Sequence, residues 1–331
     1  MSARIGVFGA TGYTGREVVR LLRHHPNARK AFTTGSGAGH LAHEAGLDVE
    51  ADAYLLALPH GISATYAARL REARPEAVVV DLSGDLRLPD AKEYERWYGQ
   101  EHPAPRLLGQ AVFGLSEIYR ERLREARLVS NPGCYATSVL LPLIPLLREG
   151  LVDPSDIVAD AKSGASGAGR ALRENLLFCE VSDDFSAYAP GRTHRHVGEM
   201  EAVIEETTGQ RLELTFCPHL LPVKRGILTS LHVRTGKTPD ELVSALREAY
   251  GASPFVHVVE GAPPRLGEVV LTNDCRISVH PAARGRVVIF SALDNLVKGA
   301  AGQALQNLNL AMGWKENAGL PSAFESDGGA A

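Results

Sequence analysis

Residues 6–15 of the chain read G-V-F-G-A-T-G-Y-T-G. The segment lies between an apolar, strand-like run that begins at Ile5 and an apolar pattern with helical spacing at residues 18–22. Glycines at a strand-to-helix junction allow a tight turn and a close approach to a pyrophosphate, whose charge the N–H groups of the helix N-terminus stabilise. The segment therefore predicts a dinucleotide site, with contacts from Gly9, Thr11, Gly12, Tyr13 and Thr14.

The first half of the chain continues this alternation of short strands and helices. Apolar runs recur at residues 30–34, 53–58 and 77–82, and a helical pattern lies at residues 62–70. Strands that are buried on both faces and joined by helical crossovers form a parallel sheet with helices on both sides. We therefore expect an α/β, doubly wound domain of the Rossmann type.

The end of the second strand indicates which dinucleotide is bound. An NAD site places Asp or Glu there to hold the ribose 2′-hydroxyl, whereas this chain has T-T-G-S-G at residues 33–37. The hydroxyl and amide groups of Thr34 and Ser36 suit a 2′-phosphate, although no arginine accompanies them. We therefore predict NADP(H) as the cofactor.

The composition is that of a folded protein without a large excess of charge. The 331 residues include 44% hydrophobic and 22% charged side chains, and the formal net charge is −4. This length predicts two domains or one large one. The balance of charge disfavours binding to nucleic acid or to an anionic membrane surface, and disordered, collagen-like and coiled-coil structures do not fit the composition.

Three features favour a location in the cytoplasm. The four cysteines lie far apart without a Cys-x-x-Cys pair, which argues against a disulfide scaffold. The chain begins with no charged-then-apolar leader. The longest apolar stretch, residues 139–147, contains two prolines and is far shorter than the ~20 residues that span a membrane. We expect neither secretion nor membrane insertion.

The pattern changes after residue 134. Strand-like runs at residues 212–216, 226–233 and 286–292 are separated by fewer helices, which predicts a mixed α+β domain. Residues 293–312 carry apolar side chains at i, i+3 and i+4 spacing, which predicts a helix with one buried face.

Cys134 lies in the segment S-N-P-G-C-Y-A-T, residues 130–137, where an apolar strand ends and an apolar helical run begins. A helix N-terminus favours the thiolate, which is the nucleophilic form of cysteine. A buried structural cysteine is the alternative, but the position after a Pro-Gly turn favours a nucleophile. The other cysteines have no such setting and are expected to be core residues: Cys179, Cys217 and Cys275.

His194 and His196 flank an arginine in G-R-T-H-R-H-V-G-E-M-E, residues 191–201. A thiolate nucleophile needs a base nearby and later a proton donor, and imidazole titrates in the right range. His-x-His is also a metal-ligand spacing, but the only further candidates are Cys217 and His219. Ordinary surface histidines are the third interpretation. We favour acid/base chemistry and expect no metal.

Two arginines and a second glycine-rich loop complete the candidate residues. Arg87, in D-L-S-G-D-L-R, and Arg225, in P-H-L-L-P-V-K-R-G-I-L, border strands, and a guanidinium group suits phosphate or carboxylate. Each is equally well a solvated surface charge. The loop S-G-A-S-G-A-G-R, residues 163–170, follows a strand and either approaches a cofactor ring or is a flexible connection.

With these motifs the chain resembles the N-acetyl-gamma-glutamyl-phosphate reductases, aspartate-semialdehyde-dehydrogenase-like enzymes of arginine biosynthesis. The resemblance runs nearly end to end and also includes LPHG at residues 58–61 and DNLVKGAAGQALQN at residues 294–307. The chain departs from the family in a shortened segment between Gly35 and Asp52, which concerns the adenosine side of the cofactor. It also has Ser116 where the family has proline.

The resemblance implies NADPH-dependent reduction of N-acetyl-gamma-glutamyl phosphate, a small-molecule acyl phosphate, to N-acetylglutamate 5-semialdehyde through a thioester on Cys134. It implies His196 as the main acid/base residue with His194 close by. Substrate contacts are implied for Arg87, Arg225 and Asn131, and cofactor contacts for Pro59, His60, Ser163, Gly164, Gly167 and Asn295.

The resemblance also implies a division into domains and an assembly. Residues 1–134 and 294–331 would form the NADP-binding Rossmann domain, to which the C-terminal helix returns. Residues 135–293 would form a catalytic and oligomerisation domain of the semialdehyde-dehydrogenase type. The expected assembly is a homo-oligomer, either a dimer or a tetramer.

Two other functions stay open at this point. One is a reductase of a carrier-protein-linked aminoadipate phosphate in lysine biosynthesis, a similar group that tends to have Asn after the catalytic cysteine, where this chain has Tyr135. The other is a non-catalytic regulator that senses NADP, which would share the glycine-rich loop. A sensor would have no use for a cysteine at a helix N-terminus together with the two histidines.

Overall fold

The computed structural model describes residues 2–283 and 285–324. The chain divides into two units, Met1–Gly133 with Ala300–Leu320 and Cys134–Gly299 with Pro321–Ala331. Residues 325–331, which end the expected C-terminal segment 294–331, lie outside the described residues.

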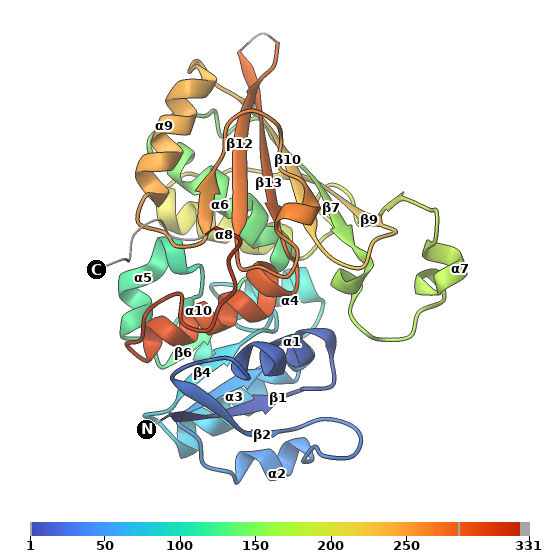
Figure 1. Cartoon of the computed structure of the whole chain (residues 1–331), viewed down its shortest axis with the longest axis vertical. Helices are drawn as coiled ribbons and strands as arrows, with labels where there is room; N and C mark the ends of the chain where they lie inside the picture. Colours follow the sequence, from blue (N-terminus) through green and yellow to red (C-terminus); the bar gives the residue numbers. More distant parts are fainter. Residues whose placement is uncertain (1, 284, 325–331) are drawn as a thin grey trace. The chain divides into compact units, whose positions relative to one another are not determined.

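The first unit is built on six parallel strands in the order β2-β1-β3-β4-β6-β5 (Figure 1). The central strands β3 and β4 are buried along their whole length, which explains their continuous apolar sequence. The prediction of a doubly wound α/β domain is confirmed. The strands are β1 Ala3–Phe8, β2 Ala28–Thr33, β3 Ala53–Leu56, β4 Val78–Asp81, β5 Val112–Phe113 and β6 Leu128–Ser130.

Helices connect these strands and cover the sheet. They are α1 Tyr13–Leu22, α2 His43–Leu47, α3 Ser63–Ala73, α4 Ala91–Tyr98, α5 Ser116–Arg124 and α10 Gly302–Ala311, with a short 3-10 turn, η1, at Pro105–Leu107. Helix α10 packs against α5, β4 and α1. The helix predicted over residues 293–312 begins later than expected, because Leu293 ends β13, residues 295–296 form a turn and a π-helical turn, η5, occupies Val297–Ala301.

Ser116, where the resemblance leads to an expectation of proline, belongs to a buried polar cluster. Its Oγ donates to Asn307 Oδ1 at 2.6 Å and accepts from Gln303 Nε2 at 2.8 Å. Asn307 Nδ2 also donates to the Gly114 carbonyl at 2.8 Å. All three side chains are fully buried, so the hydroxyl satisfies amide groups that would otherwise lose hydrogen bonds.

The second unit is a seven-stranded mixed sheet in the order β11-β12-β13-β10-β7-β9-β8. Strand β10 is antiparallel to both β7 and β13, whereas β7 is parallel to β9. The predicted mixed α+β domain is confirmed. The strands are β7 Ile157–Gly164, β8 Ser186–Ala187, β9 Thr215–Leu221, β10 Ile227–Arg234, β11 Val256–Val258, β12 Cys275–Pro281 and β13 Arg286–Leu293. The helices are α6 Cys134–Arg148, α7 Phe178–Val181, α8 His196–Thr208 and α9 Pro239–Tyr250, with 3-10 turns at Ala165–Ala168, Glu174–Leu176 and Leu266–Glu268.

Helix α6 is the buried helix of this unit and packs against α8, α9, β10 and β13. It contains Pro142 and Pro145, and a proline cannot donate to the carbonyl four residues earlier. The carbonyl that Pro145 leaves without its helical donor is that of Leu141, and the Tyr250 hydroxyl of α9 donates to it instead. The neighbouring helix thus supplies a hydrogen bond that the proline removes.

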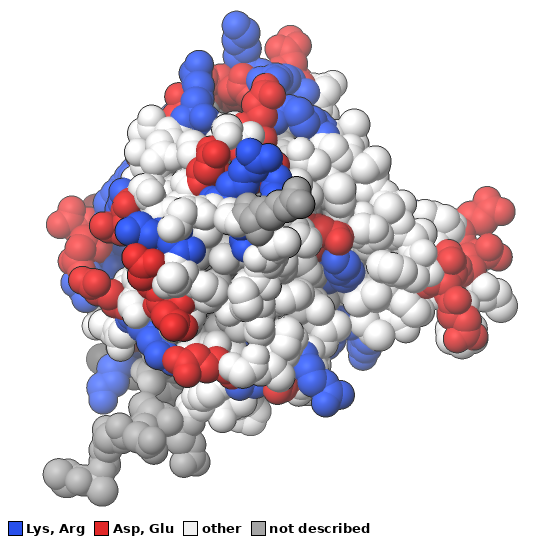
Figure 2. All heavy atoms as spheres, turned by 90° about the horizontal axis from the view of Figure 1, so that it is seen from above, with Lys and Arg blue, Asp and Glu red and all other residues white. Residues whose placement is uncertain are grey.

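The segment around α7 is the most exposed part of the second unit (Figure 1). Leu172 is 96% and Phe178 is 82% exposed, and acidic side chains gather at the tip (Figure 2). The expectation that Cys179 is a core residue is wrong, because the four-residue helix α7 has no buried face. Cys275 is buried and Cys217 partly buried. No helix among the described residues is long and apolar enough to cross a membrane.

Candidate active site

The glycine-rich loop between β1 and α1 has the shape of a pyrophosphate cradle. Gly9 has φ +75°, and a Cβ there would lie 2.2 Å from the Ala57 carbonyl oxygen. A Cβ on Gly15 would lie 2.2 Å from the Gly9 oxygen, so larger residues cannot enter either position. Gly12 caps α1 and has no side chain that could compete with a ligand for the N–H groups of the first turn. These residues fit a dinucleotide pyrophosphate.

Thr34 and Ser36, the two predicted contacts at the end of β2, differ in their surroundings. Thr34 is fully buried, and its Oγ1 accepts from the Gly9 amide at 3.2 Å and bonds with His43 Nδ1 at 2.6 Å. Thr34 therefore supports the glycine-rich loop from beneath. Ser36 is exposed and its Oγ lies 3.5 Å from Thr11 Oγ1, beside the loop.

Basic side chains that the sequence analysis missed line a pocket of about 250 Å³ next to Thr11. Arg16 and Arg20 come from α1, Arg23 is the residue that caps its C-terminus, and His40 comes from the segment after β2. From the sequence, a 2′-phosphate site was expected only at the end of the second strand, which has no basic residue. The signal that would have found them is the i, i+4, i+7 spacing of the three arginines, which places them on one helix face.

The motifs at residues 58–61 and 81–87 are joined by buried carboxylates. Asp85 accepts from the Gly61 amide at 2.7 Å and from the Ala64 amide at 3.0 Å, and so fixes the loop that carries the exposed Pro59 and His60. Burial raises the pKa of Asp81 to about 6. Hydrogen bonds from the Ser63 hydroxyl and from the hydroxyl and amide of Ser83 stabilise the anion and oppose this rise. Both acids are structural parts of the loop.

The structure brings Arg87 and Asn131 together at the carboxyl end of the parallel sheet. Arg87 Nε donates to the Asn131 carbonyl at 2.8 Å, and its Nη2 donates to the Leu82 carbonyl at 3.0 Å. Asn131 is 1% exposed, and its amide donates to Ala300 O at 3.2 Å and accepts from Asn307 at 3.0 Å. Asn131 thus orders the backbone around Arg87.

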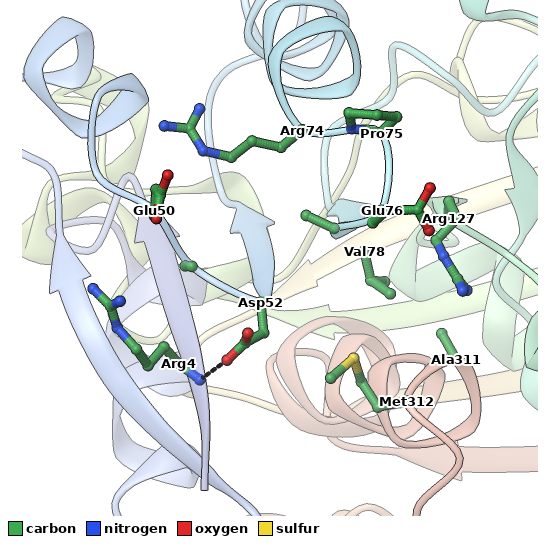
Figure 3. Close-up of a pocket in the computed structure, with 12 residues that line it drawn as sticks. Arg4, Glu50, Asp52, Arg74, Pro75, Glu76, Val78, Arg127, Ala311 and Met312 are labelled. Carbon is green, nitrogen blue, oxygen red and sulfur yellow. Dashed lines mark hydrogen bonds between the residues drawn. The ribbon is translucent and has the colours of Figure 1, made fainter. Parts of the chain in front are cut away.

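A groove of about 630 Å³ in the first unit lies at the other end of the same strands (Figure 3). Arg4 at the start of β1 and Val78 at the start of β4 are among its lining residues. Dinucleotides bind at the carboxyl ends of such strands. The groove is therefore separate from the dinucleotide loop, and its size does not make it the active site.

Cys134 is the first residue of α6 and is partly exposed. Its Cβ is so close to Gly299 that a Cβ added to that glycine would lie 2.7 Å away. A thiol at the start of a fifteen-residue helix lies at the positive end of the helix dipole, which favours the thiolate. The geometry suits a nucleophile that is held in place by a neighbouring turn.

Tyr135, the residue after Cys134, links this helix start to the two histidines. Its ring centroid lies 5.7 Å from that of His194 and 6.1 Å from that of His196, both in edge-to-face orientation. The Tyr188 hydroxyl donates to the Tyr135 hydroxyl at 3.0 Å, and the Tyr135 hydroxyl donates to the His219 carbonyl at 3.2 Å. Burial raises the pKa of both tyrosines, that of Tyr188 to about 12, so both stay protonated near neutral pH. Tyr188 was missed from the sequence because no spacing connects it to residue 135.

The two predicted acid/base residues have different roles in the structure. His196 begins α8, and its backbone N–H donates to His194 Nδ1 at 3.1 Å, which requires an unprotonated Nδ1. Burial, assisted by the charge of Arg195, lowers the pKa of His194 to about 4. His194 is therefore neutral near pH 7 and orders the start of α8. This leaves His196 as the better candidate for proton transfer.

We expect the lowered pKa of His194 to make folding stability depend on pH. An unfolded histidine binds its proton near pH 6.5, whereas folded His194 does so only near pH 4. The free energy of unfolding should therefore fall by about 1–3 kcal/mol as the pH drops through this window. Urea unfolding at several pH values gives the free energy of unfolding as a function of pH. This free energy should depend less steeply on pH for His194→Asn than for the parent or for His24→Asn, a control at an exposed site. Equal slopes in all three proteins would contradict this assignment.

Arg225 and Asn295 lie together with the second glycine-rich loop. The Arg225 guanidinium forms an ion pair with Asp294 at 2.8 Å. Asn295 is 2% exposed, and it accepts from the Gly226 amide at 2.7 Å and donates to Ser166 Oγ at 2.9 Å. Ser163 and Gly164 are buried and Gly167 is exposed, so of this loop only the latter part reaches the surface.

The His-x-His segment is not part of a metal cluster in the described ranges. Within residues 2–283 and 285–324, no group of three or more His, Cys, Asp or Glu side chains is arranged to hold a metal ion.

Two family models match the chain, and the boundary between them lies near Cys134, where the second structural unit begins. The semialdehyde dehydrogenase NAD binding domain matches residues 4–126, and the semialdehyde dehydrogenase dimerisation domain matches residues 134–295. In fold, the chain is similar to aspartate semialdehyde dehydrogenase II of Vibrio cholerae, with a TM-score of 0.71, 17% identity and coverage of 94% of this chain and 98% of that one. A probable aspartate-semialdehyde dehydrogenase of Pseudomonas aeruginosa gives a TM-score of 0.69 at 21% identity, with coverage of 94% and 99%.

Sequence similarity is much higher to a second group of proteins. The chain is 44% identical to the N-acetyl-gamma-glutamyl-phosphate reductase of Desulforapulum autotrophicum, over 96% of this chain and 97% of that protein. It is 43% identical to the protein of the same name from Pseudomonas aeruginosa, over 97% of this chain and 98% of that protein.

Proposed function

Because the chain belongs to the N-acetyl-gamma-glutamyl-phosphate reductases of the semialdehyde dehydrogenase family, we propose that it reduces N-acetyl-gamma-glutamyl phosphate to N-acetylglutamate 5-semialdehyde in arginine biosynthesis. The observation that carries this proposal is identity of 43–44% over nearly the full length of both chains. The nucleophile and the histidines at the start of two helices supply the chemistry that this reduction needs.

In the first step, the Cys134 thiolate attacks the acyl carbon of the substrate. A C–S bond forms, and the bond between the acyl carbon and the bridging oxygen of the phosphate breaks. Inorganic phosphate leaves with the electron pair of that bond. We propose that backbone N–H groups at the start of α6, among them that of Tyr135, stabilise the tetrahedral oxyanion that precedes phosphate release. The product of this step is a thioester on Cys134, which divides a difficult reduction into two easier reactions.

In the second step, the thioester is reduced and released. NADPH, held by the glycine-rich loop at Gly9, Thr11 and Gly12, would supply the hydride that reduces the thioester carbon. His196 then carries the protons: it donates to the oxygen of the hemithioacetal and takes that proton back as the C–S bond breaks, which frees the aldehyde and the thiolate. The neutral His194 holds the backbone of His196 through its Nδ1. Arg87 and Arg225 are proposed to hold the phosphate and carboxylate of the substrate.

The domain roles and assembly follow the same proposal. Residues 1–134 and 294–331 would bind NADPH, with Gly9, Thr11, Gly12, Tyr13 and Thr14 holding its pyrophosphate, and residues 135–293 would carry catalysis and oligomerisation. The second unit matches a dimerisation domain, and the exposed apolar side chains Leu172 and Phe178 belong to it. We propose a homo-oligomer, a dimer or a tetramer, and a location in the cytoplasm, where the free cysteines remain reduced.

The decisive assay is the reverse reaction, because its substrates are stable. The purified protein should reduce NADP⁺ when both N-acetylglutamate 5-semialdehyde and phosphate are present, and should fail when either is omitted. The carrier-linked aminoadipate semialdehyde is tested in parallel. Turnover with the carrier-linked substrate alone would replace the proposal by the lysine-pathway function, and NADP(H) binding without turnover on either would indicate a sensor.

We expect the enzyme to prefer NADPH to NADH, because no carboxylate ends β2 and three arginines of α1 and its C-cap line the adjacent pocket. Charge-assisted contacts to a phosphate are worth about 1.5–3 kcal/mol, or roughly 10- to 100-fold in affinity. Arg16→Ala should therefore weaken NADPH binding by about this factor and leave NADH binding unchanged. Arg124→Ala on α5 is the control, since its exposed side chain pairs with Glu121. Equal catalytic efficiency of the parent with both cofactors would contradict the 2′-phosphate assignment.

A further inference from the structure

Asp294 is a buried carboxylate whose two oxygens are both held in place. It is 0% exposed, and Oδ1 accepts from the Leu296 amide at 2.8 Å. Oδ2 accepts from the Leu271 amide at 2.6 Å and lies 2.8 Å from Arg225 Nε. With backbone donors on each oxygen, the carboxylate has one orientation, and the charge that it presents to Arg225 is stationary.

The fixed Asp294 carboxylate restricts how the Arg225 guanidinium lies. The side chain is 11% exposed, and Asp294 contacts it at Nε, the nitrogen that joins the guanidinium to its stem. A guanidinium is a rigid plane, so an ion pair at Nε restricts where its two terminal nitrogens lie. An arginine held in this way presents a planar pair of donors without the loss of conformational entropy that a mobile side chain would suffer on binding an anion.

The same turn contacts the nucleophile. The Gly299 amide donates to the Asp294 carbonyl at 2.9 Å, and Gly299 packs so closely on Cys134 that an added Cβ would lie 2.7 Å from the Cys134 Cβ. The turn at residues 294–299 therefore touches the reacting cysteine at one end and the arginine at the other.

Asn295 fixes the backbone that carries the arginine. Its Oδ1 accepts from the Gly226 amide at 2.7 Å, and the Gly226 carbonyl accepts from the Gly164 amide at 2.9 Å. A Cβ on Gly164 would lie 2.6 Å from the Arg225 amide nitrogen, so the loop and the arginine backbone are in close contact. Asp294 thus contacts the side chain of Arg225, and Asn295 holds the backbone at the next residue, Gly226.

We infer that Asp294 is a positioning residue for the reaction: it holds the Arg225 guanidinium at a fixed place relative to Cys134, so that an anionic group of the substrate is bound while its acyl carbon faces the thiolate. The inference rests on the proposed function. A purely stabilising ion pair is a weaker explanation, because buried ion pairs contribute little net stability compared with apolar replacements.

The experiment measures KM separately for phosphate, semialdehyde and NADP⁺ in the reverse reaction. Asp294→Asn keeps the size of the side chain and removes its charge. We expect a rise of about 10- to 100-fold in KM for phosphate or for the semialdehyde, and no more than a twofold change for NADP⁺. Whichever KM rises identifies the group that Arg225 binds. Asp294→Glu, which keeps the charge but displaces it, should give the same selective rise.

Two comparisons separate positioning from loss of stability. Asp274→Asn is the matched control, since Asp274 is equally buried in the same unit and accepts hydrogen bonds from Ser322 and the Ala323 amide. It should leave every KM nearly unchanged. In an Arg225→Lys background, which lacks the planar donor pair, Asp294→Asn should raise the affected KM by less than about threefold, because the two residues act as one unit.

The outcomes distinguish this inference from the proposed function. A parent enzyme without phosphate-dependent turnover would overturn the proposed function. Two results in a parent that turns over would overturn the positioning role alone. One is that the KM increases caused by Asp294→Asn and Arg225→Lys multiply in the double variant. The other is that Asp294→Asn raises KM for NADP⁺ as much as KM for the other substrates.

Discussion

Replacement of Cys134 by serine is expected to abolish turnover while the protein still folds and binds NADPH. A serine hydroxyl is far less acidic than a thiol, and the helix N-terminus that favours a thiolate does not produce an alkoxide near neutral pH. Without the thioester, hydride transfer has no acceptor on the enzyme. We expect kcat to fall by more than ~10⁴-fold, which corresponds to more than ~5 kcal/mol in the activation barrier.

The measurement is phosphate-dependent reduction of NADP⁺, together with NADPH binding and thermal unfolding of the variant. Cys179→Ser is the control, because Cys179 is exposed on α7 and lies outside the proposed chemistry. Activity of Cys134→Ser near that of the parent would make Cys134 a structural residue and remove the basis of the thioester mechanism.

Replacement of His196 by asparagine is expected to slow the chemical step and to leave cofactor affinity nearly unchanged. Loss of a general acid/base residue costs about 10²- to 10⁴-fold in rate, or about 3–5 kcal/mol in the barrier. Asparagine keeps the approximate size and one hydrogen bond but does not titrate. The pH–rate profile of the variant should therefore lose one limb that the parent has.

His194→Asn is the matched comparison, because His194 lies beside His196 but has its pKa lowered to about 4. This variant should keep the limb near neutral pH. If it loses the limb and His196→Asn keeps it, the two roles are exchanged. A bound transition metal whose removal stops turnover would overturn both assignments.

The sequence was sufficient for the parts that depend on local patterning. The glycines between β1 and α1 predicted the dinucleotide loop, since Gly9 and Gly15 are required by backbone contacts within a few residues or across one neighbouring strand. The alternation of apolar strands and helices predicted the parallel sheet, and the Pro-Gly turn before Cys134 predicted the start of α6. These features follow from hydrophobic period and from backbone sterics, which neighbouring residues express directly.

Only the tertiary structure decided which polar groups meet. Thr34 became a buried support of the loop because its hydroxyl bonds with His43 and the Gly9 amide, and arginines of α1 and its C-cap line a pocket beside the loop. His194 and His196 are equivalent in sequence, but in the fold burial lowers the pKa of His194, whose Nδ1 accepts from the His196 amide. Asp294 and Arg225 are 69 residues apart and share no pattern. Burial, desolvation and long-range pairing depend on the whole fold, and no local sequence window contains them.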